Sequence, residues 1–189
     1  WGEYSPATKM SVFNYEVELV NPQFTLTSDT LRYNTATKIA NIVGPSDIDS
    51  DENHIYSELG YYYTQQGQAE LLNRSVLSNG GKTMVGDSLF YDRNKGVGEA
   101  FYNVEFVDTI NKNMLTGNYC YYNQKVGRAF ATDEAMAVDF SQGDSLFIHA
   151  DTLQMFTFNL DTDSVFREAR AYHKVRFYRS DVQGVCDSL

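Results

Sequence analysis

Cysteine, proline and tryptophan are scarce in this chain of 189 residues, which has two Cys, three Pro and one Trp. Two cysteines are too few for the disulfide framework of a small secreted domain. Basic residues are a minority, since 15 Lys and Arg stand against 25 Asp and Glu, a formal net charge of −10. Such a surface repels a phosphate backbone, so we expect no nucleic-acid partner. No apolar run approaches the roughly 18–20 residues of a membrane-spanning helix.

Aromatic residues, by contrast, are abundant, with 14 Tyr and 12 Phe. Hydrophobic residues make up 42% of the chain, which excludes a composition too polar to fold. The length suits a single domain with a buried core. The sequence therefore predicts a folded, acidic, aromatic-rich protein.

Short segments alternate apolar and polar residues, which is the pattern of strands with one buried face. Tyr15–Leu19, Tyr102–Phe106 and Val175–Tyr178 are examples. The best helical candidate, 66–77, is flanked by a tyrosine run and by Asn79-Gly80-Gly81, which favour strands and turns. The sequence predicts an all-β protein.

A repeat runs through the chain, and each copy begins with a small residue and, in most copies, an acid. Copies start at Ser28, Ser57, Gly86, Gly117 and Ala150, or at Gly143 for the fifth, and another begins near Val185. Each continues as x-Leu-x-Tyr, a polar turn and a strand with small residues. We expect one domain, 1–189, of stacked hairpins within a polypeptide that continues past its last residue. A loop at 45–54 and an insertion at 158–164 interrupt the regular unit.

The strand period places apolar residues on one face and charged residues on the other, with Arg32, Asp92, Arg128, Lys174 and Arg176 among the charged set. A sheet of this kind must cover its apolar face, which predicts an elongated antiparallel β-jelly roll or β-solenoid with two walls. The small residues leave room for a groove or for opposing tyrosine rings, and both readings stay open. His173 is also expected on the apolar face. The candidates to line a groove are Leu31, Tyr33, Ile42, Tyr62, Leu89, Tyr91, Ala100, Tyr102, Val104, Cys120, Tyr122, Ala129, Ala131, Leu153, Met155, Ala171 and Val175.

The unit from Gly86 to Val104, with its Gly-Asp opening, aromatic residue, Gly-containing turn and Asn-Val ending, resembles the OstA-like family. Shorter versions extend the resemblance over about residues 16–189, in a tyrosine-rich style similar to Bacteroides-type members. The family includes the LptA-like periplasmic protein of lipopolysaccharide transport and the N-terminal domain of its outer-membrane partner. The resemblance implies a V-shaped β-jelly roll whose inner walls hold acyl chains.

The resemblance also implies a periplasmic or outer-membrane-associated location, with an export signal absent from a chain that begins at Trp1. The expected partners are lipopolysaccharide or a related lipid, other OstA-like proteins joined head to tail through edge strands, and a second copy of the chain. Head groups would remain in solvent, or would meet divalent ions or the basic residues of the charged face, Arg32, Arg128, Lys174 and Arg176. The alternative is a packed β-solenoid scaffold or interaction module. A third reading is sugar binding by Tyr61, Tyr63, Tyr119 and Tyr121.

Motifs for catalysis or metal binding are weak. Asp47, Asp49, Asp51 and Glu58 have EF-hand spacing, but Glu52 stands where that loop needs Gly. The segment 80–83 resembles the end of a P-loop without its first Gly. The three His have no metal-ligand spacing, the paired acids Asp161 and Asp163 lie in the insertion, and no nucleophile elbow occurs. We expect a non-enzyme with no catalytic residue, metal or cofactor.

Overall fold

The computed structural model describes residues 1–50, 53–160 and 164–189. In this part of the chain, thirteen antiparallel strands form one open sheet whose spatial order follows the sequence. The all-β prediction is confirmed, and the helical candidate lies in strand β6. The strands are β1 (Gly2–Ser5), β2 (Met10–Asn21), β3 (Phe24–Asn34), β4 (Ile39–Ser50), β5 (Asn53–Tyr63), β6 (Gln68–Asn79), β7 (Lys82–Asp92), β8 (Val97–Asp108), β9 (Asn113–Asn123), β10 (Arg128–Asp139), β11 (Leu146–Phe158), β12 (Phe166–Arg179) and β13 (Val182–Ser188).

Every even-numbered strand bends at its centre. Five of them carry two successive residues with positive φ, for example Asn73–Arg74 in β6 and Tyr102–Asn103 in β8, and the pairing register shifts there. In β4 the same place holds Gly44, with φ of 96°, followed by Pro45, which has no N–H to donate. Extra residues of this kind kink a strand and increase its twist. The single sheet therefore folds along one line, which we call the ridge.

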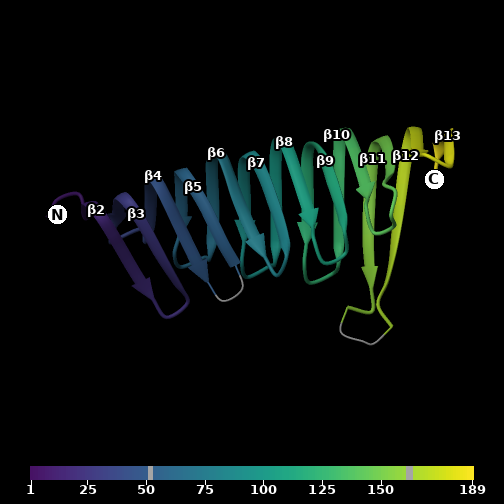
Figure 1. Cartoon of the computed structure of the whole chain (residues 1–189). Helices are drawn as coiled ribbons and strands as arrows, with labels where there is room; N and C mark the ends of the chain where they lie inside the picture. The colour runs from purple at the N-terminus through teal and green to yellow at the C-terminus, as the bar shows by residue number, and fades with distance from the viewer. Residues whose placement is uncertain (51–52, 161–163) are drawn as a thin grey trace.

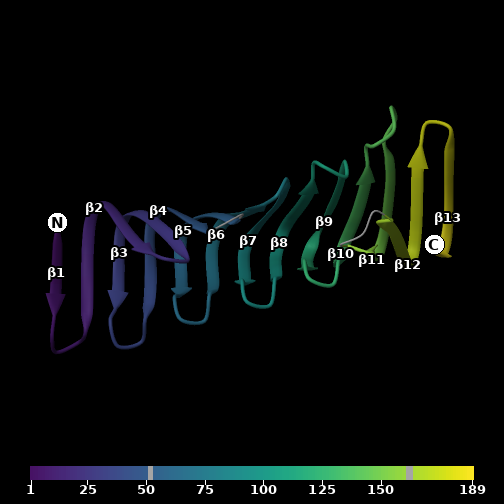
Figure 2. The same cartoon turned by 90° about the horizontal axis from the view of Figure 1, so that it is seen from below.

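The ridge divides the sheet into two facing walls that end in two rows of hairpin turns. Rim A contains the turns that follow odd-numbered strands, and rim B contains the turns that follow even-numbered strands. Figure 1 shows the strands arching over at the ridge in sequence order from β2 to β13, and we call the successive hairpins rungs. Figure 2 shows the array from below, with the hairpin turns along the rims. The apolar face lies between the walls, as the strand period predicts.

The ridge explains the small residue that opens each repeat. Ser28 and Ser57 are buried inside the bend, where their hydroxyls bond to those of Ser46 (2.6 Å) and Ser75 (2.8 Å). Later copies use Gly86, Gly117 and Ala150 at this place, whereas Gly143 lies in the loop before β11. The inner side of a sharp bend has no room for a larger side chain.

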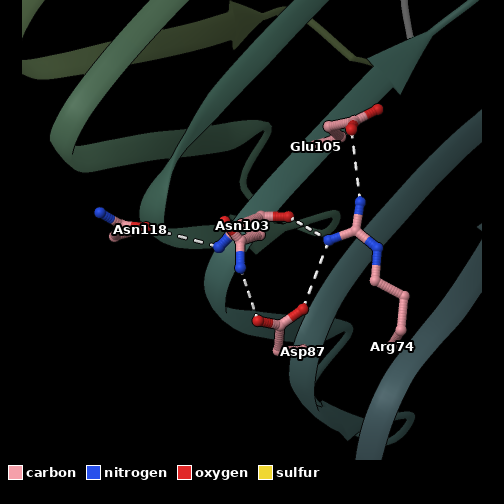
Figure 3. A network of polar contacts seen from close by, with 5 residues as sticks. All are labelled: Arg74, Asp87, Asn103, Glu105 and Asn118. Carbon is pink, nitrogen blue, oxygen red and sulfur yellow. Dashed lines mark hydrogen bonds and ion pairs between the residues drawn. The ribbon is translucent and has the colours of Figure 1, made fainter.

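In the copies that begin at Gly86, Gly117 and Ala150, the acid or amide that follows the small residue bonds to the bent strand on the outer side of the ridge. Asp87 accepts a hydrogen bond from Nδ2 of Asn103 (2.6 Å), and Oδ1 of Asn118 accepts one from the Asn103 backbone N–H (3.4 Å). Arg74 links Asp87, the Asn103 carbonyl oxygen and Glu105 (Figure 3). In the fifth copy Asp151 pairs with Lys174 (3.2 Å). These side chains hold the left-handed pairs in place.

The bend overturns two assignments that follow from the strand period. The period places Tyr102 and His173 on the apolar face, but both are exposed on the outer side of the ridge. Each belongs to a left-handed pair, with φ of 59° and 64°. The pair breaks the alternation of faces, which resumes with the buried Val104 and Val175.

Two further expectations need correction. Most of the expected loop at 45–54 is strand, because β4 runs to Ser50 and β5 begins at Asn53. Asp47, Asp49 and Glu58 are therefore strand residues, while Asp51 and Glu52 lie outside the described residues, as do Asp161 and Asp163. Asp92 is buried rather than exposed, because it accepts hydrogen bonds from Gln68 and from the backbone of Lys95. Within the described ranges, no helix is present that could cross a bilayer.

Substitution of Gly117 tests the crowding at the ridge. A Cβ there would lie 2.8 Å from the Thr132 carbonyl oxygen and 3.4 Å from Cβ of Ala131. We expect Gly117→Val to lower the free energy of unfolding by about 1–3 kcal/mol in urea titrations followed by circular dichroism. Gly143→Val is the control, because a Cβ at that position would meet no atom within 4 Å. Equal effects of the two substitutions would contradict this account.

The left-handed pair in β8 can be tested at Tyr102. A non-glycine residue in this conformation costs about 1–2 kcal/mol, which offsets the flexibility that glycine adds to the unfolded chain. We therefore expect Tyr102→Gly to leave the free energy of unfolding within about 0.5 kcal/mol of the wild type. Tyr61→Gly, at an exposed strand position of ordinary φ, should lower it by about 1 kcal/mol. A larger loss at Tyr102 than at Tyr61 would refute the assigned strain.

Candidate functional site: the mouth between the rims

One column of the inner face alternates large and small side chains along rim A. Read by strand pairing from β3 to β12, it is Tyr33, Ala40, Tyr62, Ala69, Tyr91, Gly98, Tyr122, Ala129, Met155 and Ala169. Each small residue gives the neighbouring rings room to lie between the walls. The tyrosines thus come from the Tyr of successive repeats, and the fifth copy has Met instead.

The first residues of odd-numbered strands on rim B face this column and make contacts across the mouth. The ring of Phe24 packs edge-on against Tyr62, with centroids 4.8 Å apart. The Tyr91 hydroxyl donates to Oδ1 of Asn53 (3.0 Å). Nζ of Lys82 donates to the Tyr122 hydroxyl oxygen (2.9 Å). These contacts satisfy buried phenol groups and join the two rims.

The tyrosines close the interior over the early rungs. Tyr62 and Tyr91 are only 3% and 7% exposed, and burial raises the pKa of both hydroxyls. They therefore stay protonated at neutral pH and can serve as donors. Beneath them, Leu31, Ile42 and Leu71 are fully buried. This part of the interior is a packed core.

The packing changes at the fifth copy. A cavity of about 180 Å³ lies between the rims, with Met155 and Ala129 on one side and Phe106 and Asn113 on the other. Lys82, Tyr122 and Leu160 line both this cavity and a larger, open hollow of about 750 Å³ along the mouth. Ala169, the next inner residue of the column, is exposed. The interior is thus closed in the early rungs and open in the later ones.

Three cations line the larger hollow: Lys82, Arg93 and Lys125. Their hydrogen bonds go to neutral groups, namely the Tyr122 hydroxyl, the Gln23 side chain and backbone, and the Asn94 carbonyl oxygen. Elsewhere, Arg74, Lys174 and Arg179 pair with acids. The mouth therefore concentrates positive charge in a protein of net charge −10.

The structure places most of the predicted groove residues on the inner face. Tyr33, Tyr122 and Met155 are partly buried against the core, and Tyr102 lies outside, as described above. The buried members are Leu31, Ile42, Tyr62, Leu89, Tyr91, Ala100, Val104, Cys120, Ala129, Ala131, Leu153, Ala171 and Val175. Of the predicted set, Tyr122, Ala129 and Met155 line the cavity of about 180 Å³. Whether any of them contacts lipid stays a prediction.

Sequence reasoning missed the polar side of the mouth. Asn53, Lys82 and Asn113 are the first residues of β5, β7 and β9, and each faces the tyrosine column of a later rung. The three residues occupy the same position in successive repeats, and aligning the repeats at that position could have identified them. In the sequence, Lys82 stands out only as part of a turn resembling a P-loop.

The basic residues expected to meet head groups lie away from the mouth. Arg128 lies over the rings of Phe130 and Phe156 on the outer face, and Lys174 pairs with Asp151. Arg176 contacts His149, and Arg32 is exposed on an outer strand position. These residues do not converge with the cations of the hollow.

The outer aromatic residues contact one another. Tyr119 and Tyr121 both pack against Phe130, and the Tyr119 hydroxyl donates to Glu99 (2.8 Å). Burial and the Glu99 carboxylate raise the pKa of Tyr119. Such cross-strand pairs stabilise the sheet. Sugar binding by these residues and by Tyr61 and Tyr63 stays a prediction.

Acidic and histidine side chains do not gather into a metal site in the described part of the chain, where no group of three such ligands is suitably placed. His54 lies between Asp47 (3.3 Å) and Asp49 (2.8 Å) on the surface. This cluster joins neighbouring strands of one wall.

Comparison with known proteins agrees with this architecture. Residues 1–29 match the family model described as OstA-like protein. The fold matches LptH from Pseudomonas aeruginosa, the LptA-homologous periplasmic component of its lipopolysaccharide transport device. The chain therefore resembles the OstA-like family. The match to LptH has a TM-score of 0.53 and 16% identity, and covers 57% of this chain and 89% of that one. No curated protein matches the chain.

The interior contains a buried thiol, Cys120, which is 1% exposed and pairs with Ala100 and Ala131 across the inner face. Burial raises the pKa of this thiol to about 12. Between about pH 9 and pH 12 the thiol therefore stays protonated in the folded protein, although it ionises in the unfolded chain. Its contribution to stability is present below about pH 9 and is lost as the pH rises towards 12.

We expect Cys120 to lower the free energy of unfolding by up to about 1.4 kcal/mol from pH 9 to 10, the limit for one group per pH unit, in addition to the fall caused by the buried tyrosines whose pKa is also raised. Urea titrations at each pH measure the total slope. Cys120→Ala should make it less steep by the Cys120 share, although the absolute stability falls, whereas Cys186→Ala, at an exposed position, should leave it unchanged. An unchanged slope in the Cys120 variant would contradict the burial argument.

Proposed function

We propose that this chain is a non-enzymatic, lipid-binding module that carries lipopolysaccharide during outer-membrane assembly. The observation that carries the proposal is the cavity beside Met155, which opens from a two-walled apolar interior onto a larger hollow. Acyl chains would enter between the walls from the mouth. The location that fits this role is the periplasm or the inner side of the outer membrane.

The size of the cavity limits what enters it. A cavity of about 150 Å³ holds a molecule the size of benzene, so about 180 Å³ takes a short run of methylenes rather than a whole lipid. Each buried CH₂ contributes about 0.8 kcal/mol. The remaining part of the chain would lie along the open hollow. A shallow site of this kind suits a carrier, because cargo held by a short apolar contact can leave again.

Charge at the mouth supports an anionic head group. Lys82, Arg93 and Lys125 would meet the phosphates of the lipid at the edge of the hollow. They replace the residues of the outer face in this role, because an acyl chain in the cavity brings its head group to the rims. The interaction is expected to weaken with added salt, since the three side chains line an open surface.

The edges of the sheet supply the proposed route between molecules. β1 and β13 each pair with a single strand in the described sheet, so their other sides can accept a further strand. We propose that another OstA-like protein, or a second copy of this chain, pairs there head to tail. Such pairing would continue the mouth from one molecule into the next.

A second candidate is a packed scaffold. The contacts of Phe24 with Tyr62 and of Tyr91 with Asn53 favour it, because they close the interior of the early rungs. The two proposed functions differ in whether the later rungs bind lipid between the walls. A scaffold binds no lipid there, and its edge strands alone carry its role.

Site-specific crosslinking separates the two functions. A photoreactive phenylalanine analogue at Tyr122, which lines both the cavity and the hollow and already carries a ring, should crosslink added lipopolysaccharide in a delipidated sample. The same analogue at Tyr121, on the outer face of the same strand, is the matched control and should give no adduct. Melting curves establish that both variants fold. Adducts at neither position, or equally at both, would refute lipid binding between the walls and favour the scaffold.

A further inference from the structure

The contacts between the rims follow a fixed register. The tyrosine near the end of one odd-numbered strand meets the first residue of the preceding odd-numbered strand, as Tyr62 meets Phe24, Tyr91 meets Asn53 and Tyr122 meets Lys82. The next pair in the register is Met155 of β11 with Asn113, the first residue of β9. Both residues line the cavity of about 180 Å³.

Met155 lacks the hydroxyl that the register places opposite Asn113. Oδ1 of Asn113 is a buried side-chain acceptor that has no hydrogen-bond partner in the described part of the chain. Its Nδ2 lies 3.5 Å from the Asn111 carbonyl oxygen, and this contact assigns the other side-chain atom, Oδ1, as the acceptor. Buried polar groups without partners are rare and costly in folded proteins. A missing tyrosine, a cavity and an unpaired acceptor thus coincide at one place.

We infer that this cavity is a selective site for an acyl chain that carries a hydroxyl group, whose O–H donates to Oδ1 of Asn113. This inference rests on the proposed lipid-binding function and specifies its ligand. The hydroxyacyl chain supplies the two elements of the absent tyrosine, an apolar body and a hydroxyl donor. Met155 is unbranched and flexible, so its side chain can move aside to admit the chain.

The surrounding residues favour this ligand over other polar groups. Phe106, Ala129, Leu160 and Val165 provide an apolar wall for methylenes, while Lys82, Asp108 and Arg167 form the polar part of the lining. An ionised carboxylate or phosphate can meet those cations but has no proton to donate to Asn113. A hydroxyl is neutral and is the smallest group that satisfies the acceptor.

The direct test compares tetradecanoate with 3-hydroxytetradecanoate as competitors of a fluorescent fatty acid bound to the full chain. We expect the hydroxylated probe to bind about tenfold more tightly, the value of one hydrogen bond to a buried acceptor. Asn113→Leu, of similar size, should abolish the difference while the unhydroxylated probe still binds. Asn113→Asp, which keeps an acceptor oxygen, should retain the preference.

A second test starts from the melting temperature of the ligand-free protein. Met155→Tyr restores the missing member of the column, so its hydroxyl should donate to Asn113, raise the melting temperature by about 2–4 °C above that of Met155→Phe, and weaken binding of both probes. The phenylalanine variant is the matched control, because it fills the same space without a donor.

The outcomes separate this inference from the proposed function. Binding of neither probe by the wild-type chain would refute lipid binding itself. Equal binding of the two probes, or a preference that survives Asn113→Leu, would overturn only the hydroxyl-selective site. A tyrosine variant no more stable than the phenylalanine variant would overturn the register argument on which the site depends.

Discussion

Two successive left-handed residues at the centre of a strand are the constraint on which this structure depends. A flat meander of thirteen strands would leave its apolar face in water, and the bend lets that face cover itself. The cost of the left-handed pair is met locally, by small residues inside the ridge and by side chains such as Asp87 and Asn118 outside it. The small residue and the acid or amide that open each repeat are therefore the chemical signature of a bend, whereas the tyrosine of the repeat belongs to the mouth.

Much of the fold could be predicted from the sequence, because strand alternation and the repeat are local signals. The class, the hairpin unit and the two-walled arrangement follow from them. The faces of Tyr102 and His173 cannot be read in the same way, since the period of two fails where successive residues have positive φ. The segment 45–54 misleads for a related reason, because Gly44-Pro45 suggests a loop although it forms the bend of β4.

The candidate site was only half predictable. Tyr33, Tyr62, Tyr91 and Tyr122 stand out as repeated letters, but the repeat does not say whether the rings fill the space between the walls. That depends on the partners across the mouth, which come from a different hairpin. Met155 replaces the fifth tyrosine, and the sequence alone does not show the effect of this change. The effect becomes visible in the structure, where Met155 and Asn113 line the same cavity.

The order of the strands has a consequence for how the molecule forms. Each strand pairs only with its neighbours in sequence, so no pairing waits for a distant part of the chain to arrive. Folding can begin in one hairpin and spread as each new rung adds the same kind of contact. Each rim contact joins a tyrosine to the first residue of the preceding odd-numbered strand. A rung is therefore stabilised by these contacts only after the following hairpin has docked. A polypeptide that emerges N-terminus first could thus complete its early, tyrosine-closed rungs before its open ones exist.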